Sequence, residues 1–245
     1  MPVISSFSYS GTELDAVSEA TNYYAWVFDS FSAAIGRNVV EVGAGTGTVS
    51  DLILSRASID ELLLIEPATN NVPALHQRFD GDRRVRVHFG YLGDVSSTLR
   101  VDTVIAVNVL EHVERDAEFL IDAYNSLVGG GTLLLLVPAV PLIFGSLDRA
   151  FEHHRRYTRN GLQKALRGAG FEIEKLHYLN LVGVAAWFVA GRIMHRRTLG
   201  RGQVRFYDRL VIPWLRRLES LIQPPIGQSL LAIARKPTPR QKPIS

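Results

Sequence analysis

The chain has 245 residues, of which 47% are hydrophobic and 21% are charged, and it contains no cysteine. This composition is typical of a folded globular protein with one large domain, and the lack of cysteine excludes disulfide bonds and thiolate metal sites. The formal net charge of +3 is small, so nucleic acid or an anionic membrane surface is a weaker expectation than solvated helix faces for the clustered arginines.

The N-terminal segment, MPVISSFSYSGTELD, lacks the basic and apolar regions of a secretory signal. The longest apolar run, Leu179–Ala190, is much shorter than the roughly 20 residues that span a bilayer. We therefore expect a cytoplasmic protein without a membrane span. The proline-rich polar tail, residues 237–245, is expected to be disordered.

From residue 38 onward, strand-like apolar runs alternate with helix-like stretches, which is the pattern of a parallel sheet with crossover helices. The pattern predicts strands at 38–42, 61–65, 85–89, 102–107 and 132–137, and helices at 48–56, 72–79, 115–128 and 159–168. The VGGG run at 128–131 is expected to end a helix before a buried strand. Two further strands, 171–178 and 229–235, complete a doubly wound, seven-stranded α/β sheet with an antiparallel last strand. Its ligand should lie at the carboxyl ends of the strands.

The first predicted strand runs into a glycine-rich loop, VVEVGAGTGTVSDL, in which Gly43, Gly45 and Gly47 follow Glu41. Dinucleotide-binding loops have the pattern G-x-G-x-x-G, but Thr48 occupies the position of the last glycine here. An acid beside the loop would also oppose a pyrophosphate at the helix N-terminus. The loop therefore favours a ligand with an ammonium or sulfonium group, such as S-adenosylmethionine, over NAD. An ordinary tight turn is the alternative.

The second predicted strand, LLLIEP, ends at Glu66, about twenty residues after the glycines. An acid at this position can accept hydrogen bonds from the hydroxyl groups of a ribose. The same feature occurs in dinucleotide-binding proteins, so it indicates an adenosine-type ligand without choosing between cofactors.

The segments VVEVGAGTGTVSDLIL, LLLIEP and NVLEHVERD resemble, in this order, the motifs of the class I S-adenosylmethionine-dependent methyltransferases. The small-molecule branch with the ubiquinone and menaquinone methyltransferases is the most similar, and NYYAWVFDSF at 22–31 is similar to its cofactor-covering helix. The resemblance spans residues 22–178 and implies a Rossmann-like fold that binds S-adenosylmethionine, with Glu41 near the amino group and Glu66 on the ribose. The implied cofactor-binding residues are Trp26, Glu41, Gly43, Ala44, Gly45, Gly47, Glu66, Pro67, Tyr91, Leu92, Asn108, Val109 and Leu110.

The acceptor is expected beside the segment FEHHRRYT, which follows the fifth predicted strand. It resembles a G-H-Y-R-R-Y segment of bacterial small-molecule methyltransferases, from which it departs at Glu152 and His154. Histidine has a side-chain pKa near neutrality, so His153 is the predicted general base, and His112, His153 and Tyr157 are predicted to contact the acceptor. The alternative is that this segment forms only structural hydrogen bonds. No metal site is predicted.

Two further segments could shape the acceptor site. Phe7 and Tyr9 lie in a serine-rich stretch and could form an aromatic lid with the helix that follows, within residues 1–36. The cofactor-binding core is expected at 37–178 and 229–236. Residues 179–228 form a helix-like insertion that could cap the acceptor, contact a second subunit or lie on a membrane, with core or subunit packing as the default.

The leading hypothesis is an enzyme that methylates nitrogen or oxygen of a small molecule, as a monomer or homodimer. The aromatic lid favours a flat heterocycle in antibiotic biosynthesis, and overall length is similar to the azapteridine N-methyltransferases of toxoflavin biosynthesis. A quinone or lipid-like acceptor is the alternative. A nucleic-acid methyltransferase is disfavoured because NVLE replaces the D/N-P-P-Y/F turn after the fourth strand. An NAD-dependent oxidoreductase is disfavoured by the glycine loop, and a non-catalytic cofactor-binding protein remains open.

Overall fold

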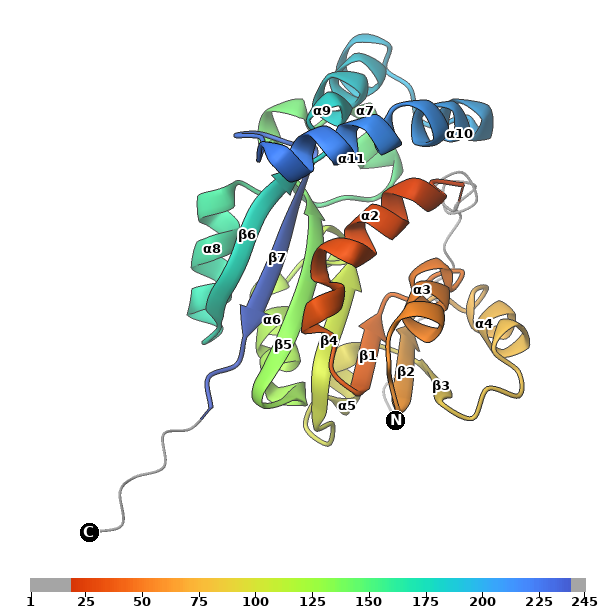
Figure 1. Ribbon diagram of the computed structural model, residues 1–245, viewed down its shortest axis with the longest axis vertical. Coiled ribbons are helices and arrows are strands. Elements are labelled where there is room, and N and C mark those ends of the chain that lie inside the picture. The colour runs from red at the N-terminus through yellow and green to blue at the C-terminus, as the bar shows by residue number, and fades with distance from the viewer. Residues whose placement is uncertain (1–18, 239–245) are drawn as a thin grey trace.

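The computed structural model describes residues 19–238 of the chain. Seven strands form one sheet in the order β3-β2-β1-β4-β5-β7-β6, and β7 runs antiparallel to both of its neighbours (Figure 1). The predicted seven-stranded sheet with an antiparallel last strand is therefore confirmed. The strands are β1 (Asn38–Val42), β2 (Glu61–Glu66), β3 (Val85–Phe89), β4 (Val101–Val107), β5 (Leu127–Pro138), β6 (Glu172–Leu179) and β7 (Ser229–Arg235).

Helices connect the strands and cover both faces of the sheet. The α-helices are α2 (Thr21–Phe31), α3 (Thr48–Arg56), α4 (Val72–Arg78), α5 (Leu92–Val95), α6 (Asp116–Ser126), α7 (Ser146–Ala150), α8 (Arg159–Gly168), α9 (Leu181–Phe188), α10 (Arg201–Leu210) and α11 (Ile212–Leu221). Short helical turns occur at η1 (Ser32–Ala34), η2 (Leu110–His112), η3 (Pro141–Ile143) and η4 (Val189–Ile193). The predicted helices at 48–56 and 159–168 match α3 and α8.

The glycine run at 128–131 differs from its prediction, because it lies within β5 and does not precede the strand. Pairing between β4 and β5 steps from Val101 opposite Leu127 to Thr103 opposite Thr132. Three extra residues of β5 must therefore bulge out of the ladder, and Gly130 has a φ of 84° there. Glycine adopts that conformation without the strain that a Cβ would cause.

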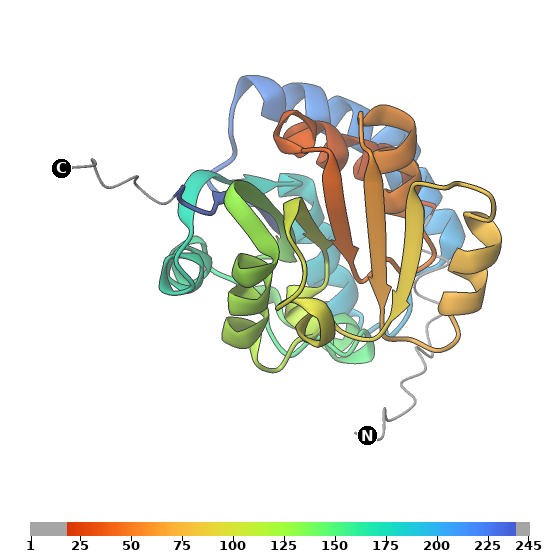
Figure 2. The same ribbon diagram turned by 90° about the horizontal axis from the view of Figure 1, so that it is seen from below.

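The core consists of two apolar layers, one on each face of the sheet (Figure 2). Helices α6 and α8 pack on one face through residues such as Leu120 and Leu162. Helices α2, α3 and α11 pack on the other face through Phe28, Ile53 and Leu215. Each such side chain contributes about 1.5–3 kcal/mol when it is fully buried. These layers hold the strands in register and fix the edge where their carboxyl ends meet.

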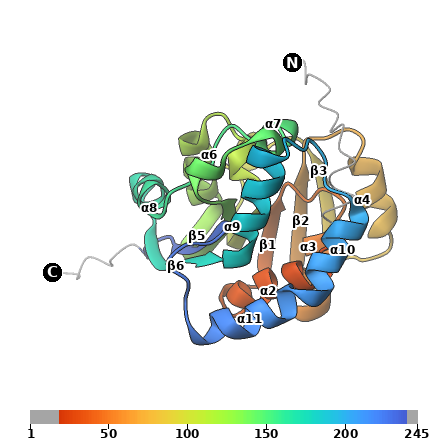
Figure 3. The same cartoon turned by 90° about the horizontal axis from the view of Figure 1, so that it is seen from above.

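The insertion forms α9, η4, α10 and α11, which lie across the carboxyl ends of the parallel strands (Figures 1 and 3). Asp208 of α10, only 1% exposed, accepts hydrogen bonds from the backbone N–H groups of Asn22 and Tyr23 at 3.0 and 2.9 Å. These are first-turn donors of α2, whose N-cap residue, Ala20, has no side chain that can accept them. Asp208 therefore caps α2 from the insertion and ties the two segments together.

We expect Asp208→Ala to lower the free energy of unfolding by about 2 kcal/mol, because it removes charged hydrogen bonds to the first-turn N–H groups of α2. Urea unfolding followed by circular dichroism measures this change. The exposed neighbour Arg209 is the matched control, and Arg209→Ala should change stability by less than about 0.5 kcal/mol. Equal stabilities of the two variants would show that the cap does not hold α2.

Candidate active site

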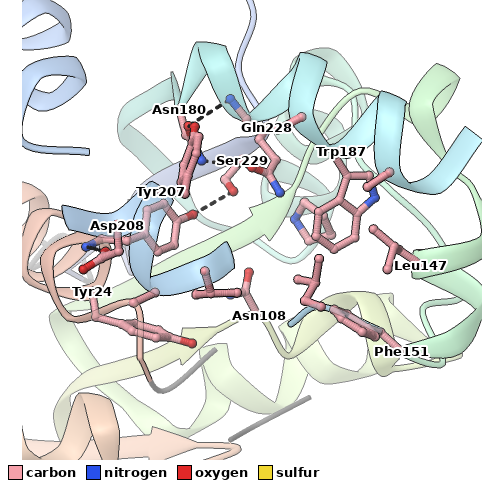
Figure 4. Close-up of a pocket in the computed structure, with 18 of the residues that line it drawn as sticks. Tyr24, Asn108, Leu147, Phe151, Asn180, Trp187, Tyr207, Asp208, Gln228 and Ser229 are labelled. Carbon is pink, nitrogen blue, oxygen red and sulfur yellow. Dashed lines mark hydrogen bonds between the residues drawn. The ribbon is translucent and has the colours of Figure 1, made fainter. Parts of the chain in front are cut away.

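A cavity of about 930 Å³ opens at the carboxyl ends of the strands. Its walls are the glycine loop after β1, helix α2, the segment after β4, the segment between β5 and α8, and the insertion (Figure 4). This volume lies near the upper end of the range of ligand pockets, about 300–1,000 Å³. The cavity is therefore large enough for an adenosine-type cofactor together with an acceptor.

The glycine loop has the conformation that its sequence requires. Gly43, Gly45 and Gly47 have φ angles of 70°, 56° and 83°, which favour glycine. A Cβ on Gly43 would lie 2.6 Å from Cγ2 of Val109, so the chain after β4 can approach the loop only when position 43 lacks a side chain. Gly43, Ala44 and Gly45 line the cavity. Gly47 lies outside the lining and is the N-cap residue of α3.

Glu66, at the end of β2, holds the glycine loop through hydrogen bonds to backbone N–H groups. Its carboxylate is 4% exposed and accepts hydrogen bonds from the N–H groups of Gly45 at 2.7 Å and Ala68 at 2.9 Å. The side chain lies at the strand end where the sequence predicts a ribose contact. The carboxylate lies outside the cavity lining, so the ribose contact stays a prediction, and its two hydrogen bonds hold the loop in place.

Glu41 lies differently from the sequence interpretation. Its carboxyl group is 4% exposed, accepts a hydrogen bond of 2.6 Å from Ser50 Oγ in α3, and lies outside the cavity lining. Burial raises the pKa of Glu41 to about 8, and the negative charge of Glu66 raises it further against the opposing effect of the Ser50 hydrogen bond. The sequence interpretation assumes that Glu41 is ionised and faces the ligand. With a pKa of about 8, the Glu41 carboxyl is instead largely protonated at neutral pH. Its contact with the cofactor stays a prediction.

The raised pKa of Glu41 gives a prediction for stability. The unfolded group titrates near 4.5 and the folded group near 8, so its favourable contribution is complete below 4.5 and is lost as the pH rises through 8. Glu41→Gln should therefore gain stability relative to the wild type between pH about 5 and about 9. Urea unfolding across that range measures the difference. A difference independent of pH, or one matched by the exposed control Glu61→Gln, would contradict this account.

The segment after β4 brings only part of its predicted set to the cavity. Asn108, with a φ of 54°, lines the cavity, and Val109 packs against Gly43. Leu110 is fully buried in the core and is not in the cavity wall. Its carbonyl oxygen accepts a hydrogen bond of 3.2 Å from the Tyr157 hydroxyl.

Four other predicted cofactor contacts lie outside the cavity lining: Trp26, Pro67, Tyr91 and Leu92. Trp26 is 6% exposed in the core beneath α2, and Leu92 is 2% exposed in the opposite core layer. Tyr91 is 54% exposed at the surface. Core packing turns Trp26 and Leu92 away from the cavity, and the contacts of all four residues with the cofactor stay predictions.

His153 is positioned by a buried acid that the sequence interpretation missed. Its Nδ1 lies 3.1 Å from Oδ1 of Asp148, which has no exposed surface. The same carboxylate accepts hydrogen bonds from Arg156 Nε at 2.5 Å, Trp187 Nε1 at 3.0 Å and the Gly145 N–H at 2.9 Å. Burial opposes ionisation, but the His153 hydrogen bond, the charge of Arg156 and the other donors together lower the pKa of Asp148 to about 2.

Glu111 and His112 lie beside His153 in the cavity wall. The His112 and His153 rings stand edge to face, with centroids 4.9 Å apart, and burial and the His153 charge lower the pKa of His112 to about 4. Burial raises the pKa of Glu111 to about 8. Oε2 of Glu111 has no hydrogen-bond partner among the described residues. Ligand atoms of these three side chains lie within 4.8 Å of one another, a spacing that the sequence interpretation did not foresee.

Tyr157 and the predicted aromatic lid complete the set. The Tyr157 hydroxyl donates hydrogen bonds to the Leu110 carbonyl and to Asp116 Oδ2 at 3.0 Å, and the ring is outside the cavity lining. This geometry supports the structural alternative for Tyr157. Phe7 and Tyr9 lie outside the described residues. Two aromatic residues of α2, Tyr23 and Tyr24, line the cavity, and the Tyr23 hydroxyl lies 2.9 Å from Ser229 Oγ.

Residues 17–176 match a family model described as a methyltransferase domain. The chain is 30% identical over 142 residues to a probable S-adenosylmethionine-dependent methyltransferase of Mycolicibacterium smegmatis, a match that covers 57% of this chain and spans about half, 53%, of that relative. Within the described residues, no helix is long and apolar enough to cross a membrane.

Solved structures share the fold. An S-adenosylmethionine-dependent methyltransferase from Mesorhizobium loti matches with a TM-score of 0.61 and 13% identity, covering 91% of this chain and 100% of that chain. A SAM-dependent methyltransferase from Archaeoglobus fulgidus matches with a TM-score of 0.56 and 17% identity, covering 91% and 94% of the two chains. At these identities the likeness concerns the fold alone.

Proposed function

The chain belongs to the family of methyltransferase domains, with S-adenosylmethionine as its methyl donor, and we propose that it methylates oxygen or nitrogen of a small molecule. The observation that carries this proposal is a single cavity with the glycine loop at one side and His153 at another. The donor fits the loop, because Gly43, Ala44 and Gly45 line the cavity without large side chains, and Val109 packs on the bare Cα of Gly43 from the other side. A cofactor can therefore approach the backbone there.

Bound S-adenosylmethionine supplies a methyl carbon that is activated by a sulfonium group. The protein must place the acceptor atom in line with that carbon and exclude water. Because Nδ1 of His153 is hydrogen-bonded to Asp148, Nε2 is the ring nitrogen available to accept a proton from a ligand in the cavity. We propose that Nε2 takes the proton from the acceptor hydroxyl or amine as the bond to the methyl carbon forms and the carbon–sulfur bond breaks.

The cavity wall supports a largely apolar acceptor. On the acceptor side the wall includes Leu147, Phe151, Trp187, Leu199 and Phe206. These side chains bind a hydrocarbon or an aromatic ring well but offer few hydrogen bonds to a polar heterocycle. We therefore favour the quinone-like or lipid-like acceptor over the flat heterocycle. The azapteridine hypothesis depends on Phe7 and Tyr9, and none of the described residues adds to it.

The test is an assay for S-adenosylhomocysteine by mass spectrometry, with two sets of acceptors. One set carries a phenol or quinol on an isoprenoid tail, and the other contains water-soluble heteroaromatic amines. We expect turnover with the first set and formation of its methyl ether. Turnover with the heteroaromatic amines alone would overturn the acceptor class. Cofactor binding without turnover of either set would favour the non-catalytic alternative.

A further inference from the structure

The insertion carries a row of large apolar side chains that nothing covers in the described chain. On α10 and α11, Phe206, Leu210, Trp214 and Leu218 are spaced four residues apart and are 65%, 56%, 71% and 55% exposed. That spacing places Phe206 and Leu210 on one side of α10, and Trp214 and Leu218 on one side of α11. We call this row, together with Ile193, Met194, Leu221 and Ile222, which are also more than half exposed, the outer face of the insertion.

The exposed charges of the insertion are almost all positive. Between residues 181 and 226 the sequence has eight arginines and no lysine, at 192, 196, 197, 201, 205, 209, 216 and 217. The two acids of this segment, Asp208 and Glu219, are 1% and 8% exposed. Arg205 and Arg216 form ion pairs with residues outside the insertion. The surface that surrounds the apolar row is therefore positively charged.

The outer face adjoins the cavity. Met194 and Phe206 belong to the outer face and also line the cavity, as do Arg196 and Leu199 from the same segment. The helices that carry them lie over the carboxyl ends of the strands (Figure 3). The outer face is therefore continuous with the cavity wall at Met194 and Phe206.

We propose that the outer face of the insertion docks the protein on an anionic lipid bilayer, and that the acceptor is an amphiphile that enters the cavity from that bilayer. Apolar and aromatic side chains flanked by arginines are the composition of helices that lie in the interface of anionic membranes. The inference about the acceptor rests on the proposed methyltransferase function, whereas the docking stands on the surface alone.

A second copy of the chain fits this face less well than a bilayer does. A symmetric dimer interface pairs a surface with itself, so it would bring the arginine-rich margins of two insertions together with no exposed acid of the segment to offset them. Anionic lipid headgroups supply the charge that the segment lacks. The bilayer is therefore the occupant that satisfies both the apolar row and the arginines.

Co-sedimentation of the full chain with vesicles tests the docking. We expect binding to vesicles of phosphatidylcholine with phosphatidylglycerol, at least tenfold weaker binding to phosphatidylcholine alone, and weakening by added salt. Trp214→Gln with Leu218→Gln, and separately Arg209→Glu with Arg217→Glu, should each weaken binding at least tenfold. The matched controls are exposed residues elsewhere, Ile121→Gln on α6 and Arg100→Glu before β4, and they should bind as the wild type does.

Each variant is also titrated with S-adenosylmethionine, which shows that its cofactor site is folded. Equal vesicle binding by all variants, or no binding to anionic vesicles, would overturn the docking even if methyl transfer is intact. A concentration-dependent dimer that the Trp214→Gln and Leu218→Gln changes dissolve would assign the face to a second copy and would also overturn it. Vesicle binding without turnover of any amphiphile would leave the docking standing and contradict the proposed function.

Discussion

Replacement of His153 by glutamine is expected to lower kcat by about 10²- to 10⁴-fold, the usual contribution of a positioned general base. The affinity for S-adenosylmethionine should stay within about twofold, because the hydrogen bond and ring contacts of His153 are with Asp148, His112 and Phe151 and not with the glycine loop. The reason for the loss in kcat is that glutamine cannot take the acceptor proton. Steady-state production of S-adenosylhomocysteine, together with calorimetric titration of the cofactor, separates the two quantities.

The control for this change is the adjacent histidine. His154 is exposed and lies outside the cavity lining, so His154→Gln should leave kcat unchanged. If His153→Gln also retains full kcat, the acceptor needs no base, and the bond between His153 and Asp148 is a structural element of the wall. Loss of folding is excluded by comparing the thermal unfolding of both variants with that of the wild type.

Gly43→Ala is expected to weaken S-adenosylmethionine binding by about 100-fold, which corresponds to about 2.7 kcal/mol. The new Cβ would lie 2.6 Å from Cγ2 of Val109, so either the glycine loop or the chain after β4 must move. Both segments line or support the cavity. A cofactor that approaches the loop backbone loses its fit when that backbone shifts.

Gly81→Ala is the matched control for the backbone strain. Gly81 has a φ of 81°, similar to the 70° of Gly43, but a Cβ there would meet nothing within 4 Å. Both changes should cost about 1–2 kcal/mol of stability from the left-handed backbone, whereas only Gly43→Ala should affect binding. Adding Val109→Ala to Gly43→Ala should restore part of the affinity, because it removes the clashing methyl group. Equal cofactor affinities of the two alanine variants would contradict this role of Gly43.

The sequence was a good guide to the elements that repeat a simple physical pattern. The strands β1, β3 and β7 have the predicted bounds, because β1 and β7 are buried, mostly apolar runs and β3 alternates apolar with polar residues. The glycine loop was also predictable, because only glycine adopts its backbone angles readily. The bulge in β5 was not, since a glycine run that follows a helix is equally typical of a helix end.

The side-chain arrangement of the site was harder to predict, because it depends on contacts between distant segments. Glu41 has the residue type and sequence position of a cofactor contact, yet its carboxyl accepts a hydrogen bond from Ser50. Asp148 gives no periodic signal in the sequence, and its role follows only from the donors that the fold gathers around it. The exposure of Trp214 likewise depends on the orientation in which α11 packs on α2. The pattern of hydrophobic residues alone does not specify that orientation.

Calorimetric titration of the full chain with S-adenosylmethionine, S-adenosylhomocysteine and NAD is the most direct test of the central claim, that this cavity holds a methyl donor. We predict saturable binding of the first two ligands at one site per chain, with no heat of binding for NAD. Gly43→Ala should weaken binding of both ligands by about 100-fold, and Gly81→Ala should leave their affinities unchanged. Tight binding of NAD without binding of S-adenosylmethionine would contradict the account.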